Sequence, residues 1–163
     1  MSVDKREIKE WGVPSIITGS VMRSMDVSDL DQVMEIEENS FPTPWSIALF
    51  KREMELDFSH ILVLEFNREI IGYINFWISA GEAHIMSIAV KEKYRKSGIG
   101  SYILQYSLNI ARRLSGEYVY LEARISNSAA HALYRKNGFE LIGIRRGYYT
   151  DTKEDALIMA REL

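Results

Sequence analysis

The stretch IAVKEKYRKSGIGS, residues 88–101, decides how the rest of the chain is interpreted. It starts in a β-rich run, 83–90, and leads into residues 99–114, where apolar residues recur at helical spacing. Between strand and helix stand Gly98 and Gly100, which lack side chains and so let successive backbone N–H groups point toward one place. Free N–H groups and the helix dipole attract anions. We therefore expect an anion-binding loop at this junction.

Arg95 and Lys96 add positive charge beside the two glycines. An ordinary strand-to-helix loop with surface charges has the same residue types, so the pattern alone leaves both interpretations open. No Gly-Lys-Ser/Thr follows, which excludes a Walker loop. The residues around Leu104 offer no third glycine, which excludes the dinucleotide-binding fingerprint.

Outward from this stretch, the hydrophobic pattern predicts about seven strands and about four helices. The strands are expected at 21–25, 60–66, 70–78, 83–90, 118–121, 139–144 and 156–160. The helices are expected at 28–40, 46–54, 99–114 and 127–137. This order of elements indicates an α/β (α+β) fold, a mixed sheet flanked by helices.

Capping residues predict where the helices begin and end. Ser28, with Asp31 three residues later, is typical of the start of the first helix, and Ser46 can cap the second. Gly116 is expected to close the third helix and Gly138 to supply the left-handed stop of the fourth.

The composition limits the class of protein. The chain has 163 residues, 47% of them hydrophobic and 26% charged, which fits a single domain, 20–163, preceded by an extension, 1–19. It has no cysteine, which excludes thiol nucleophiles, thiolate metal sites and disulfides. Its three histidines, His60, His84 and His131, are too scattered to suggest a metal site.

The formal charge of −3 provides no global field that would attract nucleic acid or an anionic membrane. The longest apolar runs, such as 61–64, are far below the roughly 20 residues needed to span a bilayer. Residues 1–19 also lack the apolar core of a secretory signal. We expect a cytoplasmic protein with neither nucleic acid nor membrane as a partner, either a monomer or a weak homodimer.

The motif Arg95-x-x-Gly98-x-Gly100, after Ile88-Ala89-Val90, resembles the acetyl-CoA-binding motif of GNAT-fold N-acetyltransferases. The stretches 121–127, 132–139 and 145–156 resemble protein N-terminal acetyltransferases of the RimI and archaeal types, and the resemblance extends from about residue 21 to 163. It implies the GNAT fold, with about seven strands and about four helices. It also implies transfer of acetyl from acetyl-CoA to the α-amino group of protein N-termini, either a ribosomal-protein alanine or a broader range of nascent chains.

The same resemblance implies a set of coenzyme-binding residues. Backbone groups of Ile88, Ala89 and Val90 would pair with the pantetheine amides, and Asn127 would hydrogen-bond the pantetheine arm. The pyrophosphate would lie in a loop formed by Arg95, Lys96, Ser97, Gly98, Ile99, Gly100 and Ser101.

Acetyl transfer to an amine needs a base for the amine and a proton donor for the departing thiolate. Glu122 lies between apolar Leu121 and Ala123, where burial is expected to raise its pKa, although an outward-facing acid paired with Lys or Arg fits equally well. The resemblance assigns the base to Glu122. It places Tyr134 beside the coenzyme sulfur as proton donor, whereas the residue alone suggests a packed core tyrosine.

His84 is a second candidate for the base. Strict alternation along its strand predicts that it shares a face with Met86 and Ile88. The resemblance to the archaeal enzymes implies a proton relay from histidine and glutamate through water. A lone strand histidine is otherwise a satisfied core or edge residue.

Two aromatic clusters in loops suit a groove for an extended peptide terminus: Phe41, Pro42 and Trp45 in one, Tyr148 and Tyr149 in the other. In the family these loops frame the substrate entrance, although Phe41 and Trp45 could equally fasten the first two helices to the sheet. Many relatives carry a glutamate about where Thr43 stands and use it as an extra base. This chain has threonine there, which argues against a second base in this loop.

Two other functions compete with N-terminal acetylation. One is acetylation of a small amine or a lysine side chain on the same fold, and the other is a non-catalytic coenzyme-binding subunit. Intact Glu122 and Tyr134 argue against the second.

Overall fold

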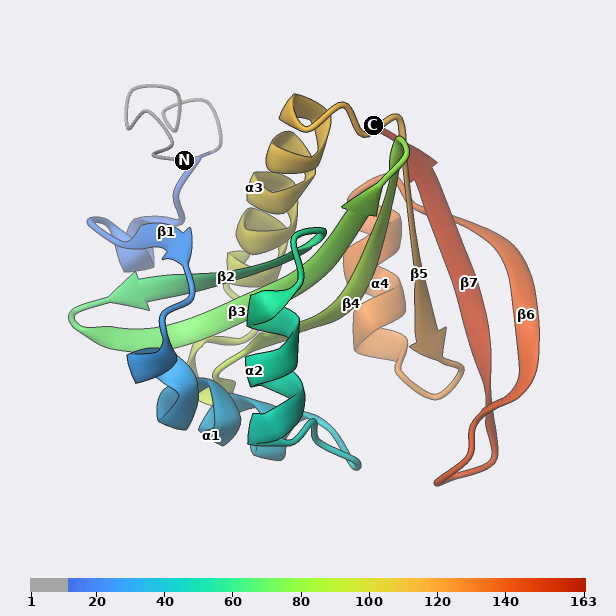
Figure 1. Ribbon diagram of the computed structural model, residues 1–163, viewed down its shortest axis with the longest axis horizontal. Coiled ribbons are helices and arrows are strands. Elements are labelled where there is room, and N and C mark those ends of the chain that lie inside the picture. Colours follow the sequence, from blue (N-terminus) through green and yellow to red (C-terminus); the bar gives the residue numbers. More distant parts are fainter. Residues whose placement is uncertain (1–11) are drawn as a thin grey trace.

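The computed structural model describes residues 12–163, which form a seven-stranded sheet in the order β1-β2-β3-β4-β5-β7-β6, with helices on both faces (Figure 1). All neighbouring strands are antiparallel except β4 and β5. The strands are β1 Val21–Ser24, β2 Ser59–Phe66, β3 Glu69–Ser79, β4 Glu82–Val90, β5 Tyr118–Arg124, β6 Glu140–Tyr149 and β7 Glu154–Glu162. The helices are α1 Leu30–Ser40, α2 Ile47–Glu55, α3 Ile99–Arg113 and α4 Ser128–Lys136. The predicted mixed sheet and order of elements are confirmed.

The sheet separates two hydrophobic cores. On one face α3 and α4 bury Ile103, Leu104 and Tyr134 against the strands, and on the other α1 and α2 bury Val33 and Phe50. Because both faces are covered, the middle of β3 is buried without alternation.

Two helix ends differ from prediction. Asp26, not Ser28, begins the first helical segment: its side chain accepts from the N–H of Ser28 at 2.9 Å, and its own N–H donates to Asp29 at 2.8 Å. Beyond the last residue of α3, Arg113, and its cap Leu114, the left-handed residue is Ser115, whose φ is +66°, not Gly116. Gly116 is needed for a different reason, because a Cβ there would lie 2.8 Å from the carbonyl oxygen of Ala111. The cap at Ser46 and the left-handed Gly138 are confirmed, and Asn127 caps the fourth helix.

A β-bulge interrupts β4. Asn75 pairs with Ser87 but the next residue of β3 pairs with Ile85, so Met86 is one extra residue. The bulge reverses which side chains face the α3 core, and His84 therefore lies on the opposite face from Ile88. The prediction that they share a face is wrong, because it assumed unbroken alternation.

The described part of the N-terminal extension packs onto the domain. Ile17 is fully buried in the core beneath α3, and Val13 packs against that core. Pro14 is the nearest contact of a Cβ built on Gly98, at 3.9 Å. Trp11, in the extension predicted over residues 1–19, lies outside the described residues. No helix within residues 12–163 is long and apolar enough to cross a membrane.

Candidate active site

The glycine loop, the segment around Gly98 and Gly100 that leads from β4 into α3, has several backbone N–H groups without a hydrogen-bond acceptor in the described chain. Gly98 is the residue before α3 and has a left-handed φ of +83°, and Lys96 also has a positive φ. Among residues 12–163, no carbonyl or side chain accepts a hydrogen bond from the N–H groups of residues 98–101. These donors lie at the positive end of a fifteen-residue helix, so the loop can bind an anion.

Arg95 does not extend freely into solvent beside this loop. Its Nε donates to the carbonyl oxygen of Val90 at 2.8 Å, and its Nη2 donates to Ser40 Oγ at 2.9 Å. Ser97 Oγ donates to the carbonyl oxygen of Tyr94 at 2.5 Å. These bonds fix the loop to the end of β4 and to α1, a role that the sequence did not predict for Arg95.

An open edge lies beside the loop. β4 pairs with β5 only from Glu82 to Ile85, so residues 86–90 have no strand partner on that side. Such an edge can pair with an extended ligand that carries amides. On the other side of the gap, where β4 and β5 no longer pair, Asn127 caps α4 through its side-chain oxygen Oδ1, which accepts from the N–H of Ala130 at 3.1 Å. Its side-chain NH₂ has no hydrogen-bond partner within the described chain.

A histidine and a glutamate are in direct contact on the α1–α2 face of this gap. Nε2 of His84 lies 2.6 Å from Oε2 of Glu122, whose side chain is only 5% exposed. The His84 ring stacks on Tyr120 with a centroid distance of 4.3 Å. The sequence singled out both residues but not their direct bond.

Glu122 differs from expectation in its acidity. Burial raises its pKa, but the hydrogen bond from His84 and the electrostatic interactions with His84 and Arg145 outweigh that effect and leave the pKa below the ordinary glutamate value. Nη1 of Arg145 lies 3.2 Å from the other carboxylate oxygen, Oε1. The predicted rise is therefore wrong: the sequence revealed the burial but not that the side chains of His84 and Arg145 reach the carboxylate.

The ionised carboxylate fixes the tautomer of His84. A carboxylate only accepts hydrogen bonds, so Nε2 of His84 carries the hydrogen of the shared bond. Nδ1 then remains free to accept a proton, since it has no partner among residues 12–163. A buried carboxylate that orients a histidine in this way is a general arrangement for base catalysis.

A model of the acetyltransferase (GNAT) family matches residues 30–139, a segment that contains β4, the glycine loop, β5 and α4. The chain belongs to the GNAT acetyltransferase family.

Relatives of this GNAT chain include bacterial and archaeal enzymes. It is 38% identical over 143 residues to a Bacillus subtilis protein described as a candidate ribosomal protein bS18-alanine N-acetyltransferase, covering 87% of this chain and 95% of the relative. It is 35% identical over 155 residues to an N-alpha-acetyltransferase of Sulfurisphaera tokodaii, covering 87% and 92%.

Solved structures agree with this assignment. The ribosomal-protein-S18-alanine N-acetyltransferase of Escherichia coli matches with a TM-score of 0.80 and 31% identity, covering 88% of this chain and 93% of that one. Ard1 of Thermoplasma volcanium matches with a TM-score of 0.82 and 26% identity, covering 90% of this chain and 99% of that one. The NatC complex, solved with Gag peptide and CoA, shares the fold at 22% identity, with a TM-score of 0.74 and coverage of 88% and 98%.

In this GNAT domain Tyr134 is a buried residue of α4 that packs against Phe139, with ring centroids 5.6 Å apart. Burial and the nearby Tyr149 raise its pKa well above the ordinary tyrosine value, so the hydroxyl stays protonated. The hydroxyl makes no hydrogen bond within the described chain. It can therefore donate a hydrogen bond to a ligand but cannot act as a base at neutral pH.

The two aromatic loops of this GNAT domain differ in exposure. Phe41 and Trp45, between α1 and α2, pack against the core, and the ring centroids of Trp45 and Phe50 are 5.4 Å apart. These two residues therefore do fasten the helices to the sheet. Tyr148 is exposed and meets Tyr149 edge to face at 5.1 Å.

Sequence reasoning missed a second buried acid. Glu37 of α1 is 1% exposed; it accepts from the N–H of Trp45 at 2.8 Å and from the hydroxyl of Tyr73, which also bonds Ser87 at 2.8 Å. Glu37 thus holds the loop after α1. The signal was present in the sequence, since Glu37 stands four residues after buried Val33 on the core-facing side of the helix.

Proposed function

We propose that this chain transfers the acetyl group of acetyl-CoA to the α-amino group of protein N-termini. The contact between His84 and Glu122, at the gap between β4 and β5, carries the proposal. It offers a positioned base where an amine could meet a thioester bound along β4. Relatives named for N-terminal acetylation support the choice of substrate.

The residues around the gap fit acetyl-CoA as the acetyl donor. The free N–H groups of residues 98–101 would bind the pyrophosphate, and the open edge at residues 88–90 would pair with the pantetheine amides. The NH₂ of Asn127 is available for the pantetheine arm. Lys96 is exposed beside the loop and would add charge.

The reaction needs one bond made and one broken. The amine nitrogen attacks the thioester carbonyl carbon, and the carbon–sulfur bond breaks. The amine proton passes to the His84–Glu122 pair, and the hydroxyl of Tyr134 donates to the departing thiolate. The chain has no cysteine to carry the acetyl group, so attack is direct in a ternary complex.

The acceptor would enter between the α1–α2 loop and the β6–β7 loop. Phe41, Pro42 and Trp45 would border it on one side and Tyr148 and Tyr149 on the other. Its first residue would be alanine, as the names of the bacterial relatives suggest, or one of a broader set.

Thiol release from acetyl-CoA tests the proposal. The enzyme should release CoA from acetyl-CoA when given peptides beginning with Ala, Ser, Met-Leu and Met-Glu, each with one internal lysine. Mass spectrometry should place the acetyl group on the first residue of the peptide. The same peptides with a blocked N-terminus are the control. Acetylation of blocked peptides would instead indicate a lysine acetyltransferase, and coenzyme binding without any turnover would indicate a non-catalytic subunit.

A further inference from the structure

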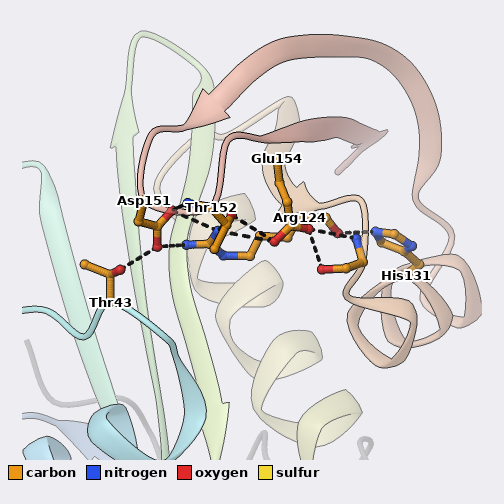
Figure 2. A network of polar contacts seen from close by, with 7 residues as sticks. Thr43, Arg124, His131, Asp151, Thr152 and Glu154 are labelled. Atoms are coloured by element: carbon orange, nitrogen blue, oxygen red, sulfur yellow. Dashed lines mark hydrogen bonds and ion pairs between the residues drawn. The ribbon is translucent and has the colours of Figure 1, made fainter.

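A polar network joins the two loops that border the proposed peptide entrance (Figure 2). The hydroxyl of Thr43, between α1 and α2, donates to Oδ2 of Asp151, between β6 and β7. Among residues 12–163, this is the only polar bond between residues 41–46 and 150–153. The two loops are 108 residues apart in sequence, so no local constraint brings them together.

Asp151 is held from the opposite side by Arg124, the last residue of β5. Nη2 of Arg124 donates to Oδ2 of Asp151 at 2.7 Å, and Nη1 donates to Oδ1 at 3.1 Å and to Thr152 Oγ1 at 2.7 Å (Figure 2). Two parallel bonds of this kind fix the plane of the carboxylate. The arginine side chain is itself mostly buried, at 15% exposed. One oxygen of Asp151 is thereby aimed at Thr43.

Further contacts lead from this arginine toward the proposed base. Arg124 lies over the ring of Tyr149, 4.0 Å from its centroid, and Tyr149 contacts Tyr148. Arg145 lies over the ring of Tyr148 at 5.5 Å and reaches Glu122. The residues that anchor Asp151 therefore also pack the aromatic side of the entrance.

From these contacts we infer that Asp151 is a positioning residue whose bond to Thr43 joins the two loops across the entrance once an acceptor peptide is bound. The inference rests on the proposed function. The bond is single and exposed, so the loops can separate to admit a peptide and close again. Rejoining slows peptide release, and it involves neither the thioester nor the anion-binding loop.

Peptide affinity is the quantity that should change. In Thr43→Val, which keeps the shape of the side chain but removes the hydroxyl, we expect the peptide KM and the peptide Kd in the presence of CoA to rise about three- to tenfold. The kcat should stay within about twofold and the acetyl-CoA Kd should be unchanged. Thr43→Ser should restore peptide affinity. Thr150→Val is the matched control, because Thr150, beside Asp151 in the β6–β7 loop, is exposed and its hydroxyl has no partner in the described chain.

A double variant and a measurement without turnover complete the test. If the two side chains act through one bond, Thr43→Val combined with Asp151→Ala should bind peptide no worse than Asp151→Ala alone. Amide hydrogen exchange of residues 41–46 should also accelerate in Asp151→Ala, although the change is in the other loop. Additive effects, a changed acetyl-CoA Kd, or unchanged exchange in residues 41–46 would overturn the inference. A wild-type protein that acetylates no peptide would refute the proposed function, whereas the exchange measurement would still decide whether Asp151 joins the loops.

Discussion

At the scale of single residues, the bond between His84 and Glu122 means that neither side chain can be changed without altering the other. Glu122→Gln keeps the shape but cannot hold a proton as a carboxylate does, and His84→Ala removes the ring nitrogen that is free to accept one. We expect each variant to lower kcat by about 10²- to 10⁴-fold, as for loss of a general base. The double variant should be little worse than the slower single variant, because the pair acts as a unit. Steady-state kinetics on an alanine peptide measures this.

Acetyl-CoA affinity is the control for that experiment and should match wild type in both variants, since neither residue lies at the anion-binding loop. Glu122 is ionised at neutral pH because its pKa is lowered, so protonating it weakens the enzyme only in acid. The acidic limb of the pH–rate profile should therefore move in Glu122→Gln. Wild-type rates for both single variants across the peptide panel would remove the pair from the mechanism.

Tyr134 allows a test that separates catalysis from packing. The Tyr134 side chain is buried and its hydroxyl makes no hydrogen bond inside the described chain, so Tyr134→Phe should leave thermal stability and acetyl-CoA affinity nearly unchanged. The kcat should fall about tenfold or more if the hydroxyl protonates the thiolate.

The matched control is Tyr106→Phe, which removes the hydroxyl of another buried tyrosine, on α3. That variant should keep its activity. Full activity in Tyr134→Phe would reduce Tyr134 to a core residue that packs on Phe139.

The sequence singled out His84 and Glu122, which the structure brings into contact at the candidate site, but it did not predict the acidity of Glu122. Glu122 between two apolar neighbours indicated burial and therefore a raised pKa. The pKa is lowered because His84 and Arg145 reach the carboxylate from strands that are 38 and 23 residues away in the chain. Arg124 and Asp151 were missed for the same reason, since their pairing depends on how distant loops meet.

At the scale of elements, the first turn of α3 should distinguish steric from electrostatic effects on the coenzyme. Gly100→Glu places a carboxylate at the positive end of a helix, where it favours folding, but it would repel a pyrophosphate. A Cβ at this position meets only Leu133, at an ordinary 3.5 Å. We expect unchanged or higher stability with acetyl-CoA affinity at least about tenfold weaker by calorimetry.

Gly100→Gln has nearly the same size without the charge and should weaken binding much less. Equal losses in the two variants would mean that side-chain bulk, not charge, governs the loop. Unchanged affinity in Gly100→Glu would show that no anion binds there.

The elements themselves were largely predictable, because most follow periodicity and capping chemistry. The exceptions have specific causes. The extra residue Met86 breaks the two-residue period of β4, which moves His84 to the other face. Ser115 takes the left-handed conformation expected of Gly116, whereas residue 116 must be glycine because a Cβ there would lie too close to the carbonyl oxygen of Ala111.

At the scale of the whole molecule, residues 12–20 contribute to the core and are not a loose attachment. Ile17→Ala removes a fully buried side chain and should lower the free energy of unfolding by about 2–4 kcal/mol in urea denaturation. Ile16→Ala is the matched control, since Ile16 is 55% exposed, and should change stability by less than about 0.5 kcal/mol. Equal effects would mean that this segment does not pack as described.

The short pairing between β4 and β5 has a consequence for the lifetime of the protein. Within the described chain, the only strand pairing between the first four strands and the last three is that of residues 82–85 with β5, and the proposed coenzyme contacts lie on both sides of the gap beyond it. A molecule that binds both sides of the gap holds them together, and its binding free energy adds to the free energy of unfolding. In an acetyl-CoA-rich cell the enzyme would resist proteases, and in a starved cell it would be degraded faster. Its abundance would then follow the metabolic supply of the group that it transfers.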